Sequence, residues 1–251
     1  MDPIQLIILF CVSVVSGSFG TLVGGNSMIT LPILILMGLP PHTAIGTDRV
    51  GIMGVASAGF YSFHRKGMVN YRLALIFGIP CFFGGFIGAV LALQISPELL
   101  KKFIIALTVI VLIIIAANPK LGVVAATNRP IGTGRHFWGA FLSLAVGVYA
   151  GFYGPGAQTL LIYVLILVFR QTFLESAANM KIAGILTSTA AAATFAYHGA
   201  IHIPAALTLF AGCCTGSYIG AHYSDRIGSV WIKRIFIGAV LIMVVKLVMD
   251  A

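Results

Sequence analysis

Charged side chains are scarce in this sequence, since they make up 8% of its 251 residues, whereas soluble domains carry about a quarter. Hydrophobic residues make up 59%. A water-soluble fold could not bury so much apolar surface, so lipid is predicted to be the main solvent. Lys and Arg outnumber Asp and Glu by 15 to 6, but they lie in short loops between apolar runs. That distribution argues against a nucleic-acid partner and is typical of membrane-protein loops.

The sequence also lacks the patterns that mark an enzyme or a metal site. It contains no P-loop, no dinucleotide fingerprint and no Ser/His/Asp set. All four cysteines (Cys11, Cys81, Cys213 and Cys214) lie inside apolar runs without metal-ligand spacing, which favours buried, inert thiols. We therefore predict no catalytic activity, no cofactor and no metal. The first residues lack the basic region of a signal peptide, so the apolar run behind them is predicted to stay in the membrane.

Long apolar runs are what the sequence has in abundance. They cover residues 4–38, 43–63, 72–94, 99–117, 137–169, 176–197, 204–224 and 230–249. Runs of about 20 residues each predict one helical crossing of the bilayer. The runs 4–38 and 137–169 are too long for one crossing, and glycines interrupt each of them. We predict that each folds as a re-entrant helical hairpin, with two short arms that meet at mid-depth.

The two halves of the chain resemble each other. A shift of 132 residues superposes glycines, a cysteine and a basic pair: Gly67, Cys81, Gly84, Gly88 and Lys101-Lys102 on Gly199, Cys213, Gly216, Gly220 and Lys233-Arg234. Near the glycine breaks a shift of 130 residues fits better, because it places Gly24 on Gly154. Chance matching of glycine-rich apolar sequence is the alternative. Internal duplication of this kind is common in transporters.

The distribution of positive charge selects the topology. If each broken run crosses the membrane once, Lys and Arg divide seven against six between the two sides. If each is a re-entrant hairpin, they divide ten against three, which is a clear positive-inside signal. The sequence thus predicts an all-α polytopic inner-membrane protein of two inverted repeats, each a broken hairpin plus three transmembrane helices. The repeats cover residues 1–117 and 137–251, the linker 118–136 is cytoplasmic, and both termini are periplasmic.

The two glycine breaks are the first candidate binding elements. Backbone that leaves a helix inside the bilayer must line a cavity or be covered by protein. Helices that restart after Asn26 and Gly156 would direct their positive N-terminal ends, which attract anions, at mid-membrane. The alternative is that the glycines serve close helix packing. Packing is the better explanation for Gly84/Gly88 and Gly216/Gly220, whereas the breaks, with their Asn and Pro, favour a binding role: Gly24, Gly25, Asn26, Gly154 and Gly156, with Gln158 just beyond the second break.

Two cations near equivalent span starts are the second candidate. Arg49 and Lys181 are repeat mates, and each follows a polar residue two positions earlier, Thr47 or Asn179. Charges inside a span are costly and usually functional, although either side chain alone could extend to a head group. Their symmetry favours an anion site, to which Thr47 and Asn179 would add hydrogen bonds. Asp48 could carry a coupling proton or neutralise a nearby cation, and neutralisation is the preferred interpretation.

Residues 20–32, together with the run Gly38-Leu-Pro40-Pro41-His-Thr-Ala44-Ile-Gly46-Thr47-Asp48, resemble the TauE/SafE family of sulfite exporters. The resemblance extends over almost the whole chain. It implies export of sulfite, organosulfonates or related sulfur anions. Where that family usually has Asn or Ser-Lys after Gly-Thr, this sequence has Asp48-Arg49.

We therefore expect a secondary active transporter that exports a small sulfur-containing anion by alternating access, driven by the proton gradient. An anion channel of the same architecture is the alternative. The predicted partners are the lipid bilayer and a small anionic substrate. The sequence gives no indication of the oligomeric state.

Overall fold

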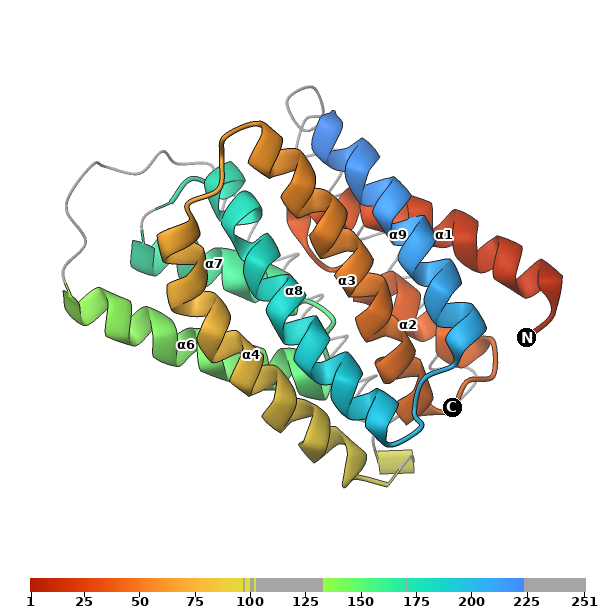
Figure 1. Ribbon diagram of the computed structural model, residues 1–251. Helices are drawn as coiled ribbons and strands as arrows, with labels where there is room; N and C mark the ends of the chain where they lie inside the picture. Colours follow the sequence, from red (N-terminus) through yellow and green to blue (C-terminus); the bar gives the residue numbers. More distant parts are fainter. Residues whose placement is uncertain (97, 100–101, 103–132, 170, 224–251) are drawn as a thin grey trace.

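The protein is all helical in the part of the chain that the computed structural model describes, residues 1–96, 98–99, 102, 133–169 and 171–223. The described helices form one bundle (Figure 1): α1 (Pro3–Val23), α2 (Ser27–Leu36), α3 (Pro41–Arg65), α4 (Tyr71–Leu93), α6 (Thr133–Phe152), α7 (Ala157–Phe169), α8 (Phe173–Tyr197) and α9 (Ile203–His222). The predicted ranges of α3, α4, α8 and α9 are confirmed within a few residues. The predicted spans 99–117 and 230–249, and the linker 118–136, lie almost entirely outside the described residues.

Both broken runs end one helix and start another where the glycines predict it. Gly24, Gly25, Gly154 and Gly156 have φ values of 80°, 81°, 95° and 78°, a region that glycine enters without steric cost. The restarts are confirmed, since α2 begins at Ser27 and α7 at Ala157.

The prediction that both arms of each hairpin are short is wrong for the first arm. Helices α1 and α6 have 21 and 20 residues, whereas α2 and α7 have 10 and 13. Each first arm stays helical until the first residue with positive φ, and nothing in its sequence stops it earlier. In Figure 1 the start of α1 and the end of α2 lie at one end of the bundle, and the start of α6 and the end of α7 lie at the other.

Glycine faces join helices from different halves of the chain. A Cβ atom on Gly84 or Gly88 of α4 would meet the carbonyl oxygen of Leu144 or Val148 of α6. On α9, the same change at Gly216 or Gly220 would meet the carbonyl oxygens of Val14 and Ser18 of α1. The predicted packing role of these four glycines is confirmed, because only a residue without a side chain allows backbones this close.

Polar contacts connect the long central helices α3 and α8 to their neighbours at the ends of the bundle. The Lys66 ammonium donates to the carbonyl of Ala221, 3.0 Å away, and the Asn70 amide donates to the side chain of Asn179 at 2.7 Å. At the opposite end the His202 amide donates to the Thr47 hydroxyl at 3.0 Å. These bonds hold the starts and ends of adjacent helices in register around the middle of the bundle.

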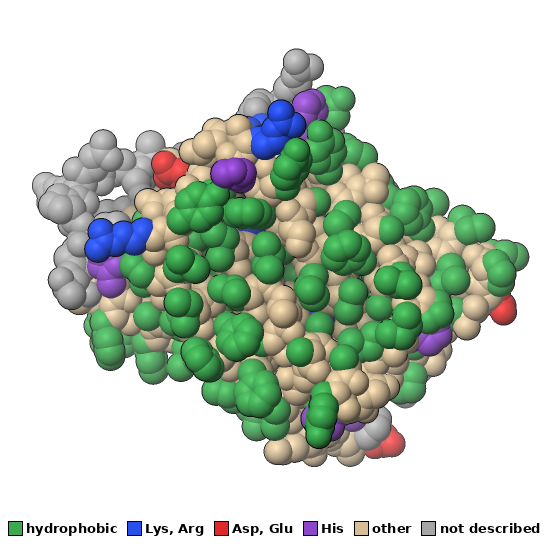
Figure 2. Space-filling model, in the orientation of Figure 1, with side chains coloured by type: hydrophobic (Ala, Val, Ile, Leu, Met, Phe, Trp, Pro, Cys, Tyr) green, Lys and Arg blue, Asp and Glu red, His purple; other side chains and the backbone are tan. Residues whose placement is uncertain are grey.

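The outer faces of the bundle are apolar. Large side chains on four helices are more than half exposed, at 64% for Ile7, 57% for Phe83, 54% for Phe141 and 64% for Leu207. Figure 2 shows hydrophobic side chains over the flank, with Lys and Arg towards the end where α3 finishes and α4 begins. Helices α1, α4 and α9 are long and apolar enough to cross a membrane. Such a surface suits lipid and not water.

Candidate functional site

Arg49 binds the end of the first arm of the second hairpin. Its side chain, 1% exposed, leaves the first third of α3. Nη1 donates to the carbonyl of Ala150 at 2.8 Å, and Nη2 donates to that of Tyr153 at 3.1 Å. The last carbonyls of a helix lack intrahelical partners and carry partial negative charge. The guanidinium therefore caps α6 at the point where its backbone breaks.

Asp48 extends this contact to the first hairpin. Its carboxylate is fully buried and lies 3.2 Å from Nη2 of Arg49. The Thr30 hydroxyl of α2 donates to the other carboxylate oxygen. A hydrogen-bonded chain thus runs from α2 through Asp48 and Arg49 to the end of α6. The sequence leaves two roles open for Asp48, carrying a coupling proton or neutralising a nearby cation. Its ion pair with Arg49 is the contact that neutralisation requires.

The two glycine breaks lie against each other. A Cβ atom on Gly24 would meet Thr159 and Gln158 in the first turn of α7, and one on Gly154 would meet the Arg49 guanidinium. Asn26 faces away from this contact, because its amide nitrogen lies 3.7 Å from the Cys213 sulfur of α9. Backbone from both halves of the chain therefore meets in the interior of the bundle.

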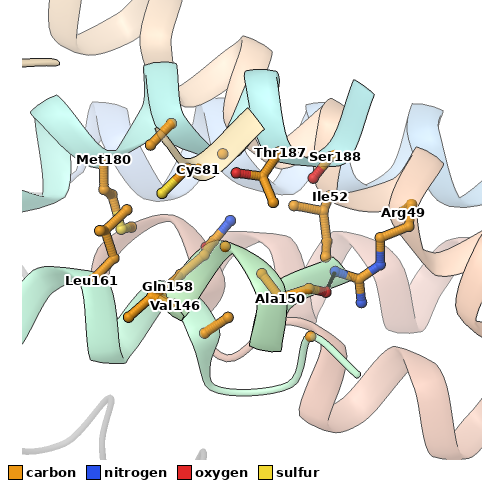
Figure 3. A pocket seen from close by; sticks show the side chains of 15 residues that line it. Arg49, Ile52, Cys81, Val146, Ala150, Gln158, Leu161, Met180, Thr187 and Ser188 are labelled. Carbon is orange, nitrogen blue, oxygen red and sulfur yellow. Dashed lines mark hydrogen bonds between the residues drawn. The ribbon is translucent and has the colours of Figure 1, made fainter. Parts of the chain in front are cut away.

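A cavity of about 30 Å³ lies beside the second break, between that hairpin and helices α3, α4 and α8. Its polar lining comes from Arg49, Gln158, Thr187 and Ser188. Three glycines, Gly147, Gly154 and Gly184, add backbone surface, and the rest is apolar: Ile52, Cys81, Val146, Ala150, Ala157, Leu161, Met180 and Ala183. Figure 3 shows Arg49 at one end of the cavity and Met180 with Leu161 at the other, with the dashed bond from Arg49 to Ala150 between them.

Two polar atoms in this lining lack hydrogen-bond partners among the described residues. They are Nε of Arg49 and Oε1 of Gln158, both buried. Gln158 belongs to the first turn of α7, whose positive end therefore also faces the cavity. Buried polar groups are nearly always paired in folded proteins, so an unpaired donor that faces a cavity indicates a place for a ligand or water. With the guanidinium and the helix end combined, that place suits a negative charge.

One face of α8 forms a wall of the cavity, and the sequence prediction missed it. The lining residues of this helix follow the spacing of a single helical face: Met180, Ala183, Gly184, Thr187 and Ser188. The signal that could have indicated this wall was the set of small and hydroxyl side chains in a span that also holds Lys181. Periodicity alone did not distinguish this face from the other small-residue faces of the chain.

The structure brings Arg49, Gly154 and Gln158 of the predicted set to the cavity, and it places the other predicted residues elsewhere. Lys181 is fully buried beside Thr21 of α1 and Gly59 of α3, and its ammonium has no partner among the described residues. Thr47 accepts from His202 and Asn179 accepts from Asn70, so both join helix ends. The cavity lining does not include Gly24, Gly25, Asn26 or Gly156, although Gly24 contacts Gln158. The two cations thus do not share this cavity.

No group of three His, Cys, Asp or Glu side chains is arranged to hold a metal ion within the described ranges. The four cysteines form no disulfide within those ranges: Cys11, Cys81, Cys213 and Cys214. The polar chemistry of the described interior consists of the Arg49–Asp48 pair, the isolated Lys181, several side-chain amides and hydroxyls, and open backbone. This inventory can bind and orient an anion.

Comparison with known proteins identifies the family of the chain. The chain is 29% identical over 245 residues to a "Probable membrane transporter protein" of Haemophilus influenzae, covering 98% of this chain and 95% of that one. It is 26% identical over 246 residues to "Probable membrane transporter protein ORF9" of a Sinorhizobium species, with coverages of 98% and 93%. It is 22% identical over 254 residues to "Probable membrane transporter protein YfcA" of Escherichia coli K12, with coverages of 100% and 92%. No solved structure gives a significant match. The model of the family described as "Sulfite exporter TauE/SafE" matches residues 9–247, and the chain therefore belongs to this family of membrane transporters.

Proposed function

We propose that this protein is a secondary active transporter that exports a small sulfur-containing anion, sulfite or an organosulfonate, across the inner membrane. The observation that carries the proposal is the guanidinium of Arg49, buried at a helix break, with an unpartnered N–H in the lining of a cavity. Charges buried within a transmembrane span are usually functional, and this one keeps an open N–H although Asp48 and two carbonyls already pair the rest of the guanidinium. The first turn of α7 adds a second positive element on the same cavity.

Alternating access by two inverted repeats is the mechanism that the packing supports. Both halves run in the order long helix, short helix, long helix, long helix, and their hairpins open at opposite ends of the bundle in Figure 1. We assign the repeats to residues 1–117 and 137–251, joined by the cytoplasmic linker 118–136. Rocking of these halves would switch access, and both termini would be periplasmic, as the positive-inside distribution requires.

Lys181, which belongs to the second repeat, supplies the equivalent positive charge beside the hairpin of the first repeat. It lies beside Thr21, near the end of α1, as Arg49 lies at the end of α6. In the opposite access state, Lys181, Asn179 and the first break (Gly24, Gly25 and Asn26) would become the anion-binding half-site, with Thr47 and Gly156 moving against them. The proton gradient would drive the cycle, with Asp48 as the candidate coupling group because it connects both hairpins.

Flux in proteoliposomes tests this proposal. Arg49→Ala and Lys181→Ala are each expected to lower the export of sulfite and of methanesulfonate at least tenfold, because each removes the charge of one half-site. Arg65→Ala is the matched control: it removes an exposed cation at the end of the same helix as Arg49, and it should transport normally. Unchanged flux in the Arg49→Ala/Lys181→Ala double variant would overturn the assignment.

The same vesicles distinguish a carrier from an anion channel. Flux through a carrier saturates with substrate and responds to an imposed proton gradient. Flux that rises linearly over a wide concentration range and ignores the pH difference would identify the channel.

A further inference from the structure

Two helix starts, one at each end of the bundle, are built alike. Asn70 precedes α4 and His202 precedes α9, and the 132-residue shift between the halves of the chain superposes one on the other. Their backbones agree closely, with φ and ψ of −94° and 96° at Asn70 and of −89° and 97° at His202. In Figure 1 the connection from α3 to α4 lies at one end of the bundle, and the connection from α8 to α9 lies at the other.

Each of these residues makes the same two hydrogen bonds. The Asn70 amide donates to Oδ1 of Asn179 on α8 at 2.7 Å, and the His202 amide donates to the Thr47 hydroxyl on α3 at 3.0 Å. In both, the side chain also accepts a bond of 3.2 Å from the backbone N–H three residues later, which caps the new helix. The 132-residue shift superposes Thr47 on Asn179 as well. The two contacts are therefore equivalent.

The capping side chains differ in how they respond to pH. The amide of Asn70 carries no charge, whereas an imidazole gains a proton as the pH falls from about 8 to about 5. The bond from the Ala205 N–H requires a lone pair on Nδ1 of His202. A protonated ring has no such lone pair, and it would face both that N–H and the positive N-terminal end of α9. Protonation therefore breaks the cap at His202 and leaves the cap at Asn70 unchanged.

Other titratable and charged groups lie towards this end of the bundle. They are the amino group of Met1 and Asp2 at the start of α1, His42, Asp48 and Arg49 on α3, Glu98 and Lys102 after α4, and Tyr197 and His198 at the end of α8. Asp48 and Arg49 pair with each other. The rings of His42 and His198 contact helix carbonyl oxygens, which accept from a charged ring as well as from a neutral one. Of these three histidines, His202 thus makes the bond that its charged form cannot make.

We infer that His202 controls the opening of the periplasmic end: a proton taken up from the periplasm breaks the cap of α9 and releases the start of α9 from Thr47. The ring is half-buried, so water reaches it. The loop before it lies directly on α3, because a Cβ atom on Gly46 would overlap the Ala200 carbonyl oxygen. Asp48 and Arg49 follow Thr47 on α3, so this release reaches the binding site.

This inference rests on the proposed function and its orientation, and it adds a residue that positions the site. The contact of Asn70 with Asn179 would hold the cytoplasmic end in the same way, but without a response to pH. Acid on the periplasmic side would therefore favour the outward-open state, in which an exporter releases its substrate.

Hydrogen–deuterium exchange of the full chain in lipid nanodiscs, without substrate, tests the contact itself. After correction for the intrinsic pH dependence of amide exchange, the start of α9 is expected to exchange about fivefold faster at about pH 5.5 than at about pH 7.5, the size of a typical N-cap contribution. His202→Asn copies the side chain of the cytoplasmic contact and should remove this difference. Asn70→His should create one at the start of α4.

Two further variants complete the comparison. His198→Gln changes a neighbouring ring that faces a carbonyl, and it should keep the response of the parent protein. His202→Ser, which is also a good N-cap residue, provides the same test if His202→Asn does not fold.

Flux in proteoliposomes measures the effect on transport. Methanesulfonate is suitable because its charge does not change in this pH range, and equal pH on both sides removes the driving force of a proton gradient. The ratio of initial flux at about pH 5.5 to that at about pH 7.5 is expected to be about threefold or more higher in the parent protein than in His202→Asn.

The outcomes separate this inference from the proposed function. An equal exchange response in the parent protein and His202→Asn, or a response that His198→Gln removes, overturns the inference and leaves anion transport intact. A flux ratio that His202→Asn does not lower also overturns it. The expected exchange response together with no flux of sulfite or methanesulfonate at either pH supports the pH-sensitive contact and overturns the proposed function.

Discussion

The contact between Gly154 and Arg49 leads to a quantitative prediction. Gly154 has φ of 95°, and a Cβ atom there would overlap the guanidinium. In Gly154→Ala the guanidinium must leave the carbonyls of Ala150 and Tyr153, which it contacts at 2.8 and 3.1 Å. Two charged hydrogen bonds at about 1.5 kcal/mol each put the loss at roughly 3 kcal/mol, and the left-handed backbone adds about 1–2 kcal/mol of strain.

Gly67→Ala is the control that measures the cost of the left-handed backbone alone. Gly67 has φ of 67°, and a Cβ atom there has no neighbour within 4 Å, so only the roughly 1–2 kcal/mol of backbone strain is expected. Denaturant titration of both variants in detergent micelles gives the difference in the free energy of unfolding, and sulfite flux gives the functional effect. The reasoning fails if the two variants are equally stable, or if Gly154→Ala transports like the parent protein.

Three further predictions follow from the same contacts. Arg49→Met should lower the free energy of unfolding by about 3–5 kcal/mol, because it leaves the Asp48 carboxylate buried without its partner. Adding Asp48→Asn should restore most of that stability, and a double variant that loses the sum of the two single losses would contradict a coupled pair. Gly88→Ala should cost about 1–3 kcal/mol, since its Cβ atom would overlap the α6 backbone, whereas Gly134→Ala on α6, with open space around it, should lower the melting temperature little or not at all. With the native thiols replaced, a cysteine at Arg65 should react with an impermeant maleimide only from the cytoplasmic side and one at Gln94 only from the periplasmic side; the reverse pattern would invert the proposed orientation.

The sequence by itself determined where most of the described helices begin and end. Glycines at 24–25 and at 154 and 156 mark both breaks, because positive φ is a local steric requirement that needs no knowledge of the fold. The glycine faces of α4 and α9 were recognisable for the same reason, since spacing along a helix places residues four apart on one face. The membrane environment followed from composition, and membership in the TauE/SafE family agrees with it.

Only the tertiary structure decided which polar residues meet. The polar residues of α3 and α8 lie on several sides of each helix, because consecutive residues point in different directions. Spacing alone therefore could not tell that Arg49 lines the cavity while Lys181 lies against Thr21 and Gly59. Likewise, the partners of Thr47 and Asn179 come from distant helices, 155 and 109 residues away in the chain. Local sterics act through neighbouring residues and can be read along the chain, whereas a binding pocket depends on how separate helices turn their faces towards one another, which is settled only when they pack.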